Sequence, residues 1–125
     1  MKFDFDNNIP IYIQIVEQLK IYIISGKMKP GERLLSVREL ASQTKVNPNT
    51  MQKALAELEQ QKLVHTERTN GKFVTNDQKL ITKLKREYAY ELAKKDFLDM
   101  ENIGFNKTET IQYLQELKGE KLWIY

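Results

Sequence analysis

Residues 34–63 constrain the fold of this chain more than any other stretch, because they encode two helices separated by a very short connection. Ser36 is followed three residues later by Glu39, which is the capping-box pattern that marks the start of a helix. The Asn47-Pro48 pair marks a second start, since asparagine is a good N-cap and proline fits the first helical position. Residues 44–46 are then expected to form the turn between the two helices.

The second of these helices has one apolar and one polar face. Its apolar residues recur at i, i+3, i+4 and i+7, the buried stripe of an amphipathic helix, on Met51, Ala54, Leu55 and Leu58. The opposite face carries amide, hydroxyl and ammonium groups, on Asn49, Thr50, Gln52 and Lys53. A helix-turn-helix presents such groups near the start of its second helix to base edges. The pattern is compatible with DNA binding but does not establish it, because two short amphipathic helices with a polar face also occur in many other folds.

After residue 63 the pattern changes to alternation, which predicts a β-hairpin. Residues 64–67 and 72–75 are predicted strands, and Asn70-Gly71 between them is a turn signal because both residues tolerate positive φ. A two-stranded hairpin is marginal by itself, so it must pack on the helices. A helix-turn-helix followed by such a hairpin is a winged helix.

A further helix is predicted on each side of this unit. Residues 10–25 place apolar side chains at helical spacing, on Tyr12, Ile15, Val16, Leu19 and Ile23. Residues 77–101 contain no Gly or Pro and predict a helix of roughly 37 Å. Asn106 and Glu109 form a second capping box that predicts a last helix. The tail, residues 122–125, is unusually apolar for a terminus and is expected to pack.

The composition excludes several classes of protein. Cysteine is absent, so there is no disulfide framework and no thiolate metal site. No apolar run approaches the roughly 20 residues that span a bilayer, and the acidic N-terminus is unlike a signal peptide. A single histidine, His65, leaves little acid–base chemistry near neutral pH. We therefore expect a cytoplasmic protein that is not an enzyme and has no metal, no other cofactor and no membrane partner.

The positive charge is concentrated in the first part of the chain. The formal net charge is +3. Residues 1–75 hold 11 Lys and Arg against 8 Asp and Glu, whereas residues 76–125 hold 9 of each. This agrees with a nucleic-acid-binding face on one half only. We predict a winged helix-turn-helix DNA-binding domain in residues 1–75 and a helical dimerisation segment in residues 76–125.

Three blocks of the chain resemble the GntR family of bacterial transcription regulators. They are residues 36–41 (SVRELA), 46–50 (VNPNT) and 54–59 (ALAELE). The match runs from about Ile9 to Val74, and the VNPNT block in so short a chain is similar to the YtrA-like branch. The resemblance implies a mostly α fold with a small β wing and a helical C-terminal part for dimerisation. The family usually has a second glycine where Thr69 stands, and often has proline where Leu35 stands.

The resemblance and the polar groups together predict the residues that contact DNA. The family uses the arginine that matches Arg38 for this purpose, and a guanidinium suits phosphate or guanine. The predicted set is Arg33, Ser36, Arg38, Asn47, Asn49, Thr50, Gln52, Lys53, Asn70, Gly71 and Lys72.

Residues 76–125 carry two apolar stripes, more than so short a segment can bury by itself. They either fold back on the helix of residues 10–25 or form a two-fold interface, and the resemblance favours the interface. The predicted interface residues are Leu84, Tyr88, Leu92, Phe97 and Leu114.

The expected function is that of a sequence-specific transcription regulator. The resemblance implies a homodimeric repressor of a transporter-type operon, bound to double-stranded DNA at a pseudo-palindromic operator. No feature of the sequence identifies a small-molecule effector. The alternative is a winged-helix module that binds another protein, which an apolar outer face on residues 51–59 would indicate.

Overall fold

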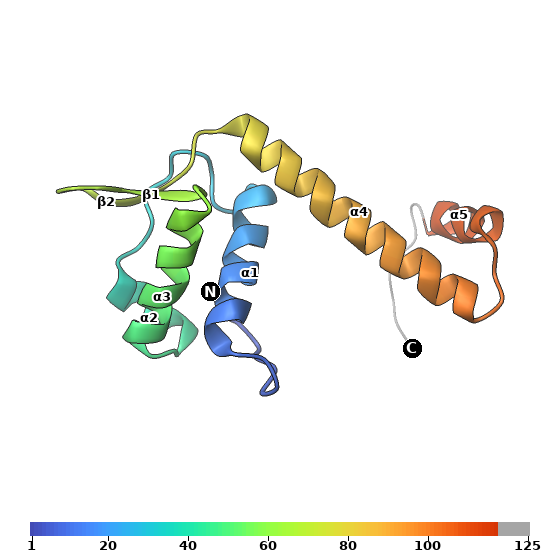
Figure 1. Cartoon of the computed structure of the whole chain (residues 1–125), viewed down its shortest axis with the longest axis horizontal. Helices are drawn as coiled ribbons and strands as arrows, with labels where there is room; N and C mark the ends of the chain where they lie inside the picture. The colour runs from blue at the N-terminus through green and yellow to red at the C-terminus, as the bar shows by residue number, and fades with distance from the viewer. Residues whose placement is uncertain (118–125) are drawn as a thin grey trace. The chain divides into compact units, whose positions relative to one another are not determined.

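Five helices and one two-stranded antiparallel sheet make up the part of the chain that this computed structural model describes, residues 1–117 (Figure 1). In chain order they are α1 (Ile11–Ile24), α2 (Val37–Thr44), α3 (Pro48–Gln60), β1 (Val64–Glu67), β2 (Gly71–Val74), α4 (Gln78–Asn102) and α5 (Lys107–Glu116). The predicted fold class, mostly α with a small wing, is confirmed. The apolar tail, residues 122–125, lies outside the described residues.

None of the described helices is long and apolar enough to cross a bilayer.

Contacts divide the chain into two compact units, Met1–Lys85 and Arg86–Tyr125. The start of α4 belongs to the first unit, because Ile81 is only 8% exposed and packs with Leu80 and Leu84 against its core. The division thus falls later than the predicted boundary at residue 75. With the later division the first unit holds 14 Lys and Arg against 9 Asp and Glu, and the second holds 6 against 8. The two units therefore carry net charges of opposite sign.

The core of the first unit forms around α3, which packs against α1, α2 and β1. The predicted apolar stripe of α3 is confirmed, since Met51, Ala54, Leu55 and Leu58 are at most 1% exposed. The stripe of α1 is buried except at Tyr12, which is half-buried. The largest fully buried side chains are Ile15, Leu19, Ile23, Leu40, Met51, Leu55, Leu58, Leu63, Val64 and Val74. This closed core gives the unit a fixed outer surface.

Both helices of the helix-turn-helix begin where the sequence predicts. Ser36 and Glu39 form the capping box: each side chain accepts the other residue's backbone N–H at 3.1 Å. Asn47 caps α3, its Oδ1 accepting the N–H of Asn49 at 2.7 Å. The turn between the helices depends on Lys45, whose φ of 58° ends α2 in the left-handed conformation. These caps fix where α3 begins and hence which residues occupy its first turns.

The wing contains an extended segment that was not predicted. Residues 31–34 lie along β2, although the sequence there carries no strand signal. The N–H of Leu34 donates to the carbonyl oxygen of Lys72 at 2.8 Å, and the N–H of Gly31 donates to that of Val74 at 3.0 Å. The N–H of Val74 donates in turn to the carbonyl oxygen of Glu32 at 2.9 Å. These bonds tie the hairpin to the segment that leads into α2.

The hairpin turn differs from the prediction. Asn70 does not adopt positive φ; only Gly71 does, at +98°. The N–H of Asn70 donates to the carbonyl oxygen of Glu67 at 3.1 Å, and Glu67 pairs with Gly71 across the sheet. Three residues, 68–70, therefore connect the strands instead of the predicted four, 68–71. The reason is that a β-turn over residues 67–70 precedes the glycine, which alone takes the left-handed conformation.

The second unit contains most of α4 together with α5. Gly104, with φ of +101°, lies in the connection, where a left-handed residue reverses the chain. Asn106 and Glu109 form the predicted capping box at the start of α5. The ring of Phe105 packs edge-on against Tyr113 at 5.3 Å between centroids. Among the described residues of this unit, up to Leu117, most of the large apolar side chains are exposed in the single chain: Tyr90, Leu92, Leu98, Ile103, Ile111, Tyr113, Leu114 and Leu117.

Candidate nucleic-acid interface

The outer face of α3 is the polar surface opposite the core stripe. Its exposed side chains are Asn49, Gln52, Lys53, Ala56 and Gln60. With 3.6 residues per turn, Asn49, Ala56 and Gln60 form its middle row. Lys53 lies between this row and α1, and Gln52 lies on the side that leads to the wing. Small and amide-bearing side chains in the middle row leave a surface that can enter a major groove.

At the start of α3, the side chain of Asn47 caps the helix. The Oδ1 of Asn47 accepts the N–H of Asn49 as the helix cap, whereas its amide nitrogen takes no part in the cap. Thr50 is half-buried, which differs from the prediction that it points away from the core. Asn49 itself is exposed and is thus the amide best placed at the start of the helix.

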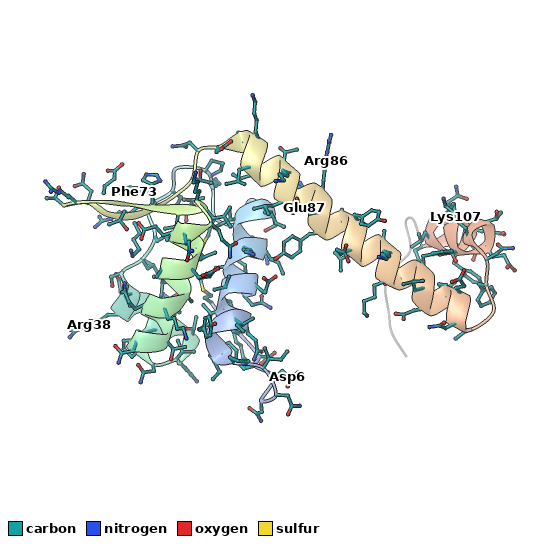
Figure 2. The ribbon with its side chains drawn as sticks, in the orientation of Figure 1. Asp6, Arg38, Phe73, Arg86, Glu87 and Lys107 are labelled. Atoms are coloured by element: carbon teal, nitrogen blue, oxygen red, sulfur yellow. The ribbon has the colours of Figure 1, made fainter. Side chains whose placement is uncertain are left out.

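The start of α2 contributes a cation and a fixed cap. Arg38 is exposed and points outward from α2 (Figure 2). Next to it, the hydrogen bond from the backbone N–H of Ser36, with the hydroxyl of Ser36 second, lowers the pKa of the Glu39 carboxyl. Glu39 stays ionised in the capping box, and the Oγ of Ser36 and the Oε1 of Glu39 each accept a backbone N–H at the helix start. Arg38 is free to extend from this rigid turn.

Lys72 of β2 is held within the wing. Its Nζ donates to the Oγ1 of Thr66 at 2.9 Å and lies 3.8 Å from the Oε2 of Glu59 on α3, and its side chain is only 19% exposed. Hydrogen bonding from the Thr66 hydroxyl is the main cause that lowers the pKa of the Glu59 carboxyl, and the charge of Lys72 adds to it. Lys72 therefore links the wing to α3 in the unbound protein.

The side chain of Arg33 lies against the turn end of the hairpin, beside Gly71. A Cβ at Gly71 would come within 3.3 Å of the Nε of Arg33, so a side chain there would have to displace the guanidinium. A groove of about 500 Å³ separates the start of α2 from the wing. Four residues predicted to contact DNA line it: Arg33, Ser36, Gly71 and Lys72. The structure thus brings together residues that lie far apart in the sequence.

Lys53 also makes a contact that the sequence does not reveal. Its Nζ lies over the ring of Tyr12 on α1, 3.9 Å from the centroid. Tyr12 is predicted as a core residue from its helical spacing, which carries no signal of a cation partner on another helix. Lys53 is therefore tethered and does not extend freely from α3.

The predicted interface residues are divided between the two units. Leu84 lies in the first unit, partly buried against its core. Leu92 and Leu114 are 63% and 56% exposed, and Tyr88 and Phe97 are half-buried. Phe97 and Leu114 both line an apolar cleft of about 640 Å³ between α4 and α5. The second unit thus presents apolar surface on both of its helices.

Among residues 1–117, no group of three or more His, Asp or Glu side chains is placed to hold a metal ion.

Residues 11–74 match the family described as "Bacterial regulatory proteins, gntR family". The chain is 35% identical over 112 residues to the HTH-type transcriptional regulator YhcF of Bacillus subtilis (strain 168), covering 90% of this chain and 93% of that protein. It is 32% identical over 121 residues to the HTH-type transcriptional repressor YtrA of the same organism, covering 96% and 93%.

Two solved structures are similar to this chain in both fold and sequence. A GntR family transcriptional regulator from Listeria monocytogenes superposes with a TM-score of 0.82 at 38% identity, covering 91% of this chain and all of that chain. The DNA-binding domain of AraR in complex with operator ORX1 superposes with a TM-score of 0.55 at 26% identity, covering 60% and 95%.

Proposed function

Because this chain belongs to the GntR family of DNA-binding transcription regulators, we propose that it is a homodimeric repressor that reads a pseudo-palindromic operator with the outer face of α3. The observation that carries the proposal is the set of exposed amide and cationic side chains on that face, next to Arg38 on α2. An apolar outer face would instead suit a protein-binding module. Relatives named as transcription regulators also favour regulation over catalysis.

The geometry supports different roles for the polar residues, some contacting bases and others contacting phosphates. Asn49 and Gln52 carry amides, which can form two hydrogen bonds with adenine in the major groove. Arg38 extends from the start of α2, beside the groove that separates α2 from the wing. Arg33 and the wing also line that groove, and the phosphate backbone can pass between the start of α2 and the wing. Phosphate contacts position the protein, and the amides then discriminate between bases.

Repression follows from tight binding at a promoter, and the relative YtrA is named as a repressor. Two copies are proposed to pair through the exposed apolar side chains of the second unit. A dimer places two copies of α3 about one helical turn of DNA apart, or a multiple of it. The transporter-type operon and the cytoplasmic location are part of the same proposal, and a small-molecule effector is left unassigned.

Selection of bound fragments from random DNA with the purified protein tests the proposal. The expected result is one enriched motif with two inverted half-sites, and light scattering should find a dimer at micromolar concentration. Recovery of no preferred sequence would overturn operator reading. A single half-site bound by a monomer would overturn the dimer while leaving DNA recognition in place.

Replacing Arg38 by Ala should weaken operator binding and leave the fold intact. The side chain is exposed, and the Ser36–Glu39 capping box does not use it, so the thermal unfolding midpoint should hardly change. Loss of one bidentate guanidinium contact is expected to cost about 1–3 kcal/mol of binding free energy. Fluorescence anisotropy with a labelled operator duplex measures it. Normal binding by Arg38→Ala would show that this arginine does not contact DNA.

Replacing Asn49 or Gln52 by Ala should relax base preference at one or two positions of each half-site. The physical reason is that an amide paired with adenine is worth about 1–3 kcal/mol against the wrong base. Repeating the selection with each variant measures the preference position by position. An equal loss of affinity for every sequence would instead identify the residue as a phosphate contact.

A further inference from the structure

Tyr12 and Lys53 connect the first turn of α1 with the outer face of α3. The ammonium of Lys53 lies 3.9 Å from the centroid of the Tyr12 ring, well within the range of a cation–π contact. Tyr12 is half-buried and lies at the edge of the core, so its ring is held by α1, whereas Lys53 is exposed. A rigid ring thus contacts a side chain that would otherwise sample many conformations.

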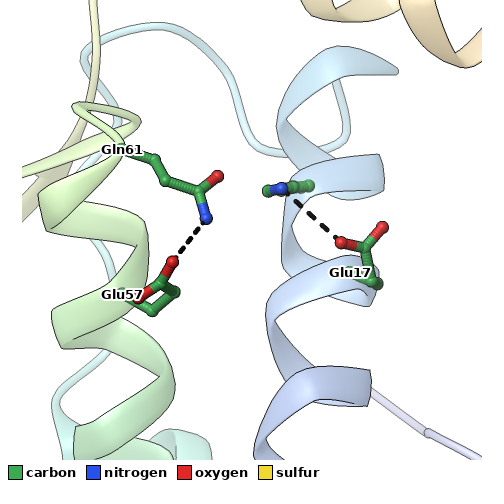
Figure 3. A network of polar contacts seen from close by, with 4 residues as sticks. Glu17, Glu57 and Gln61 are labelled. Atoms are coloured by element: carbon green, nitrogen blue, oxygen red, sulfur yellow. Dashed lines mark hydrogen bonds and ion pairs between the residues drawn. The ribbon is translucent and has the colours of Figure 1, made fainter.

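The surroundings of Lys53 indicate that this ring decides its direction. One turn further along α3, the carboxylate of Glu57 accepts a hydrogen bond from the Nε2 of Gln61 at 2.8 Å (Figure 3). On the facing helix, the Nζ of Lys20 lies 3.5 Å from the Oε1 of Glu17. Glu57 and Lys20 thus each have a partner on their own helix. The Lys53 ammonium lies over the Tyr12 ring, which draws it from the middle of the outer face toward α1.

We propose that Tyr12 is a positioning residue that holds the Lys53 ammonium at the α1 side of α3, where it binds a phosphate of the operator backbone. The inference rests on the proposed function, because it takes α3 as the helix that enters the major groove. That groove is about 12 Å wide, and a helix with its side chains is about 10–12 Å in diameter. The middle row of α3 then faces base edges, and the sides of α3 face the phosphate backbones.

The chemistry of the lysine agrees with a phosphate contact. An ammonium is a compact point charge with three donors, and it suits phosphate better than bidentate recognition of a base edge. Contact with the ring through one side leaves donors for a phosphate oxygen on the other side. Because the stem of Lys53 is already held, less conformational entropy is lost when DNA binds. Tyr12 therefore contributes to DNA affinity without touching DNA.

The test compares Lys53→Met, Tyr12→Leu, Tyr12→Phe and the Tyr12→Leu/Lys53→Met double variant of the full chain. The probes are a duplex of the sequence recovered by selection and a scrambled duplex of fixed mixed sequence. The scrambled duplex is measured at low salt whether or not selection enriches a motif. Phenylalanine keeps the ring face and serves as the conservative control. Circular dichroism verifies that each variant is folded.

Lys53→Met should weaken binding to both duplexes by the same factor. The ratio of the dissociation constants of Lys53→Met and the wild type should fall roughly threefold when the salt concentration is raised about fourfold. This is the change expected for one lost phosphate contact. Tyr12→Leu should cost roughly two- to fivefold in affinity, the scale of an exposed cation–π contact. Tyr12→Phe should bind like the wild type, and the double variant should bind no more weakly than Lys53→Met alone, because the two residues act as a unit.

Nuclear magnetic resonance of the free protein gives an independent readout. The ε-methylene protons of Lys53 should show a ring-current shift that Tyr12→Phe keeps and Tyr12→Leu abolishes. Additive losses in the double variant, or unchanged binding by Lys53→Met or by Tyr12→Leu, would overturn the proposal. A loss confined to the recovered sequence would overturn the phosphate assignment. Failure of selection to enrich any motif concerns the proposed function, and the scrambled duplex still decides the role of Tyr12.

Discussion

A chain truncated after Lys85 is expected to fold as a monomeric winged helix that binds operator DNA roughly 10²- to 10⁴-fold more weakly than the full chain. The first unit should fold because its core is closed by its own residues, including Ile81 at the start of α4. Binding should weaken because the truncation removes the exposed apolar surface through which two copies are proposed to pair. A monomer then binds one half-site without the effective concentration that a linked second half-site provides.

Light scattering and anisotropy with the full operator and with an isolated half-site measure the two effects. The truncated chain should bind both duplexes almost equally, whereas the full chain should prefer the complete operator. A second truncation after Val74 is the matched control for the boundary. It also removes Leu80, Ile81 and Leu84 from the core and should melt at a lower temperature than the longer fragment. A truncated chain that still dimerises would show that the interface lies in the first unit.

Replacing Leu55 by Ala is expected to lower the free energy of unfolding by about 2–5 kcal/mol. Leu55 is fully buried in the centre of α3, the helix that contacts α1, α2 and β1, so these elements cannot all close on the space it leaves. The loss therefore combines the lost burial of the side chain with the cost of a cavity. Urea denaturation followed by circular dichroism measures it.

Leu35→Ala is the matched control, since Leu35 is the same residue type and is 41% exposed. Its cost should be well below that of Leu55→Ala, because less apolar surface returns to water and no closed cavity forms. Equal costs for the two substitutions would contradict the assignment of Leu55 to the core.

Local signals in the sequence were sufficient for the helix starts and for the buried stripe of α3. Capping depends on residues three apart in the chain, as with Ser36 and Glu39 or Asn106 and Glu109, and both boxes form as predicted. The hairpin was also predicted, but its turn was not, because an Asn-Gly pair is compatible with more than one loop length. Residues 31–34 were missed because their partner strand lies about forty residues further along the chain, and so short a segment has no alternation of its own.

In the candidate site, too, some features depend on neighbours in the sequence and others on contacts between separate elements. The polar outer side of α3 follows from the sequence alone, because helical periodicity assigns each residue to a face. What two cations of the site do before DNA binds depends on tertiary packing: Lys72 of β2 pairs with Glu59 of α3, and Lys53 of α3 lies over Tyr12 of α1. Each of these contacts joins two elements whose packing depends on the whole core. Periodicity along one helix therefore carries no information about them.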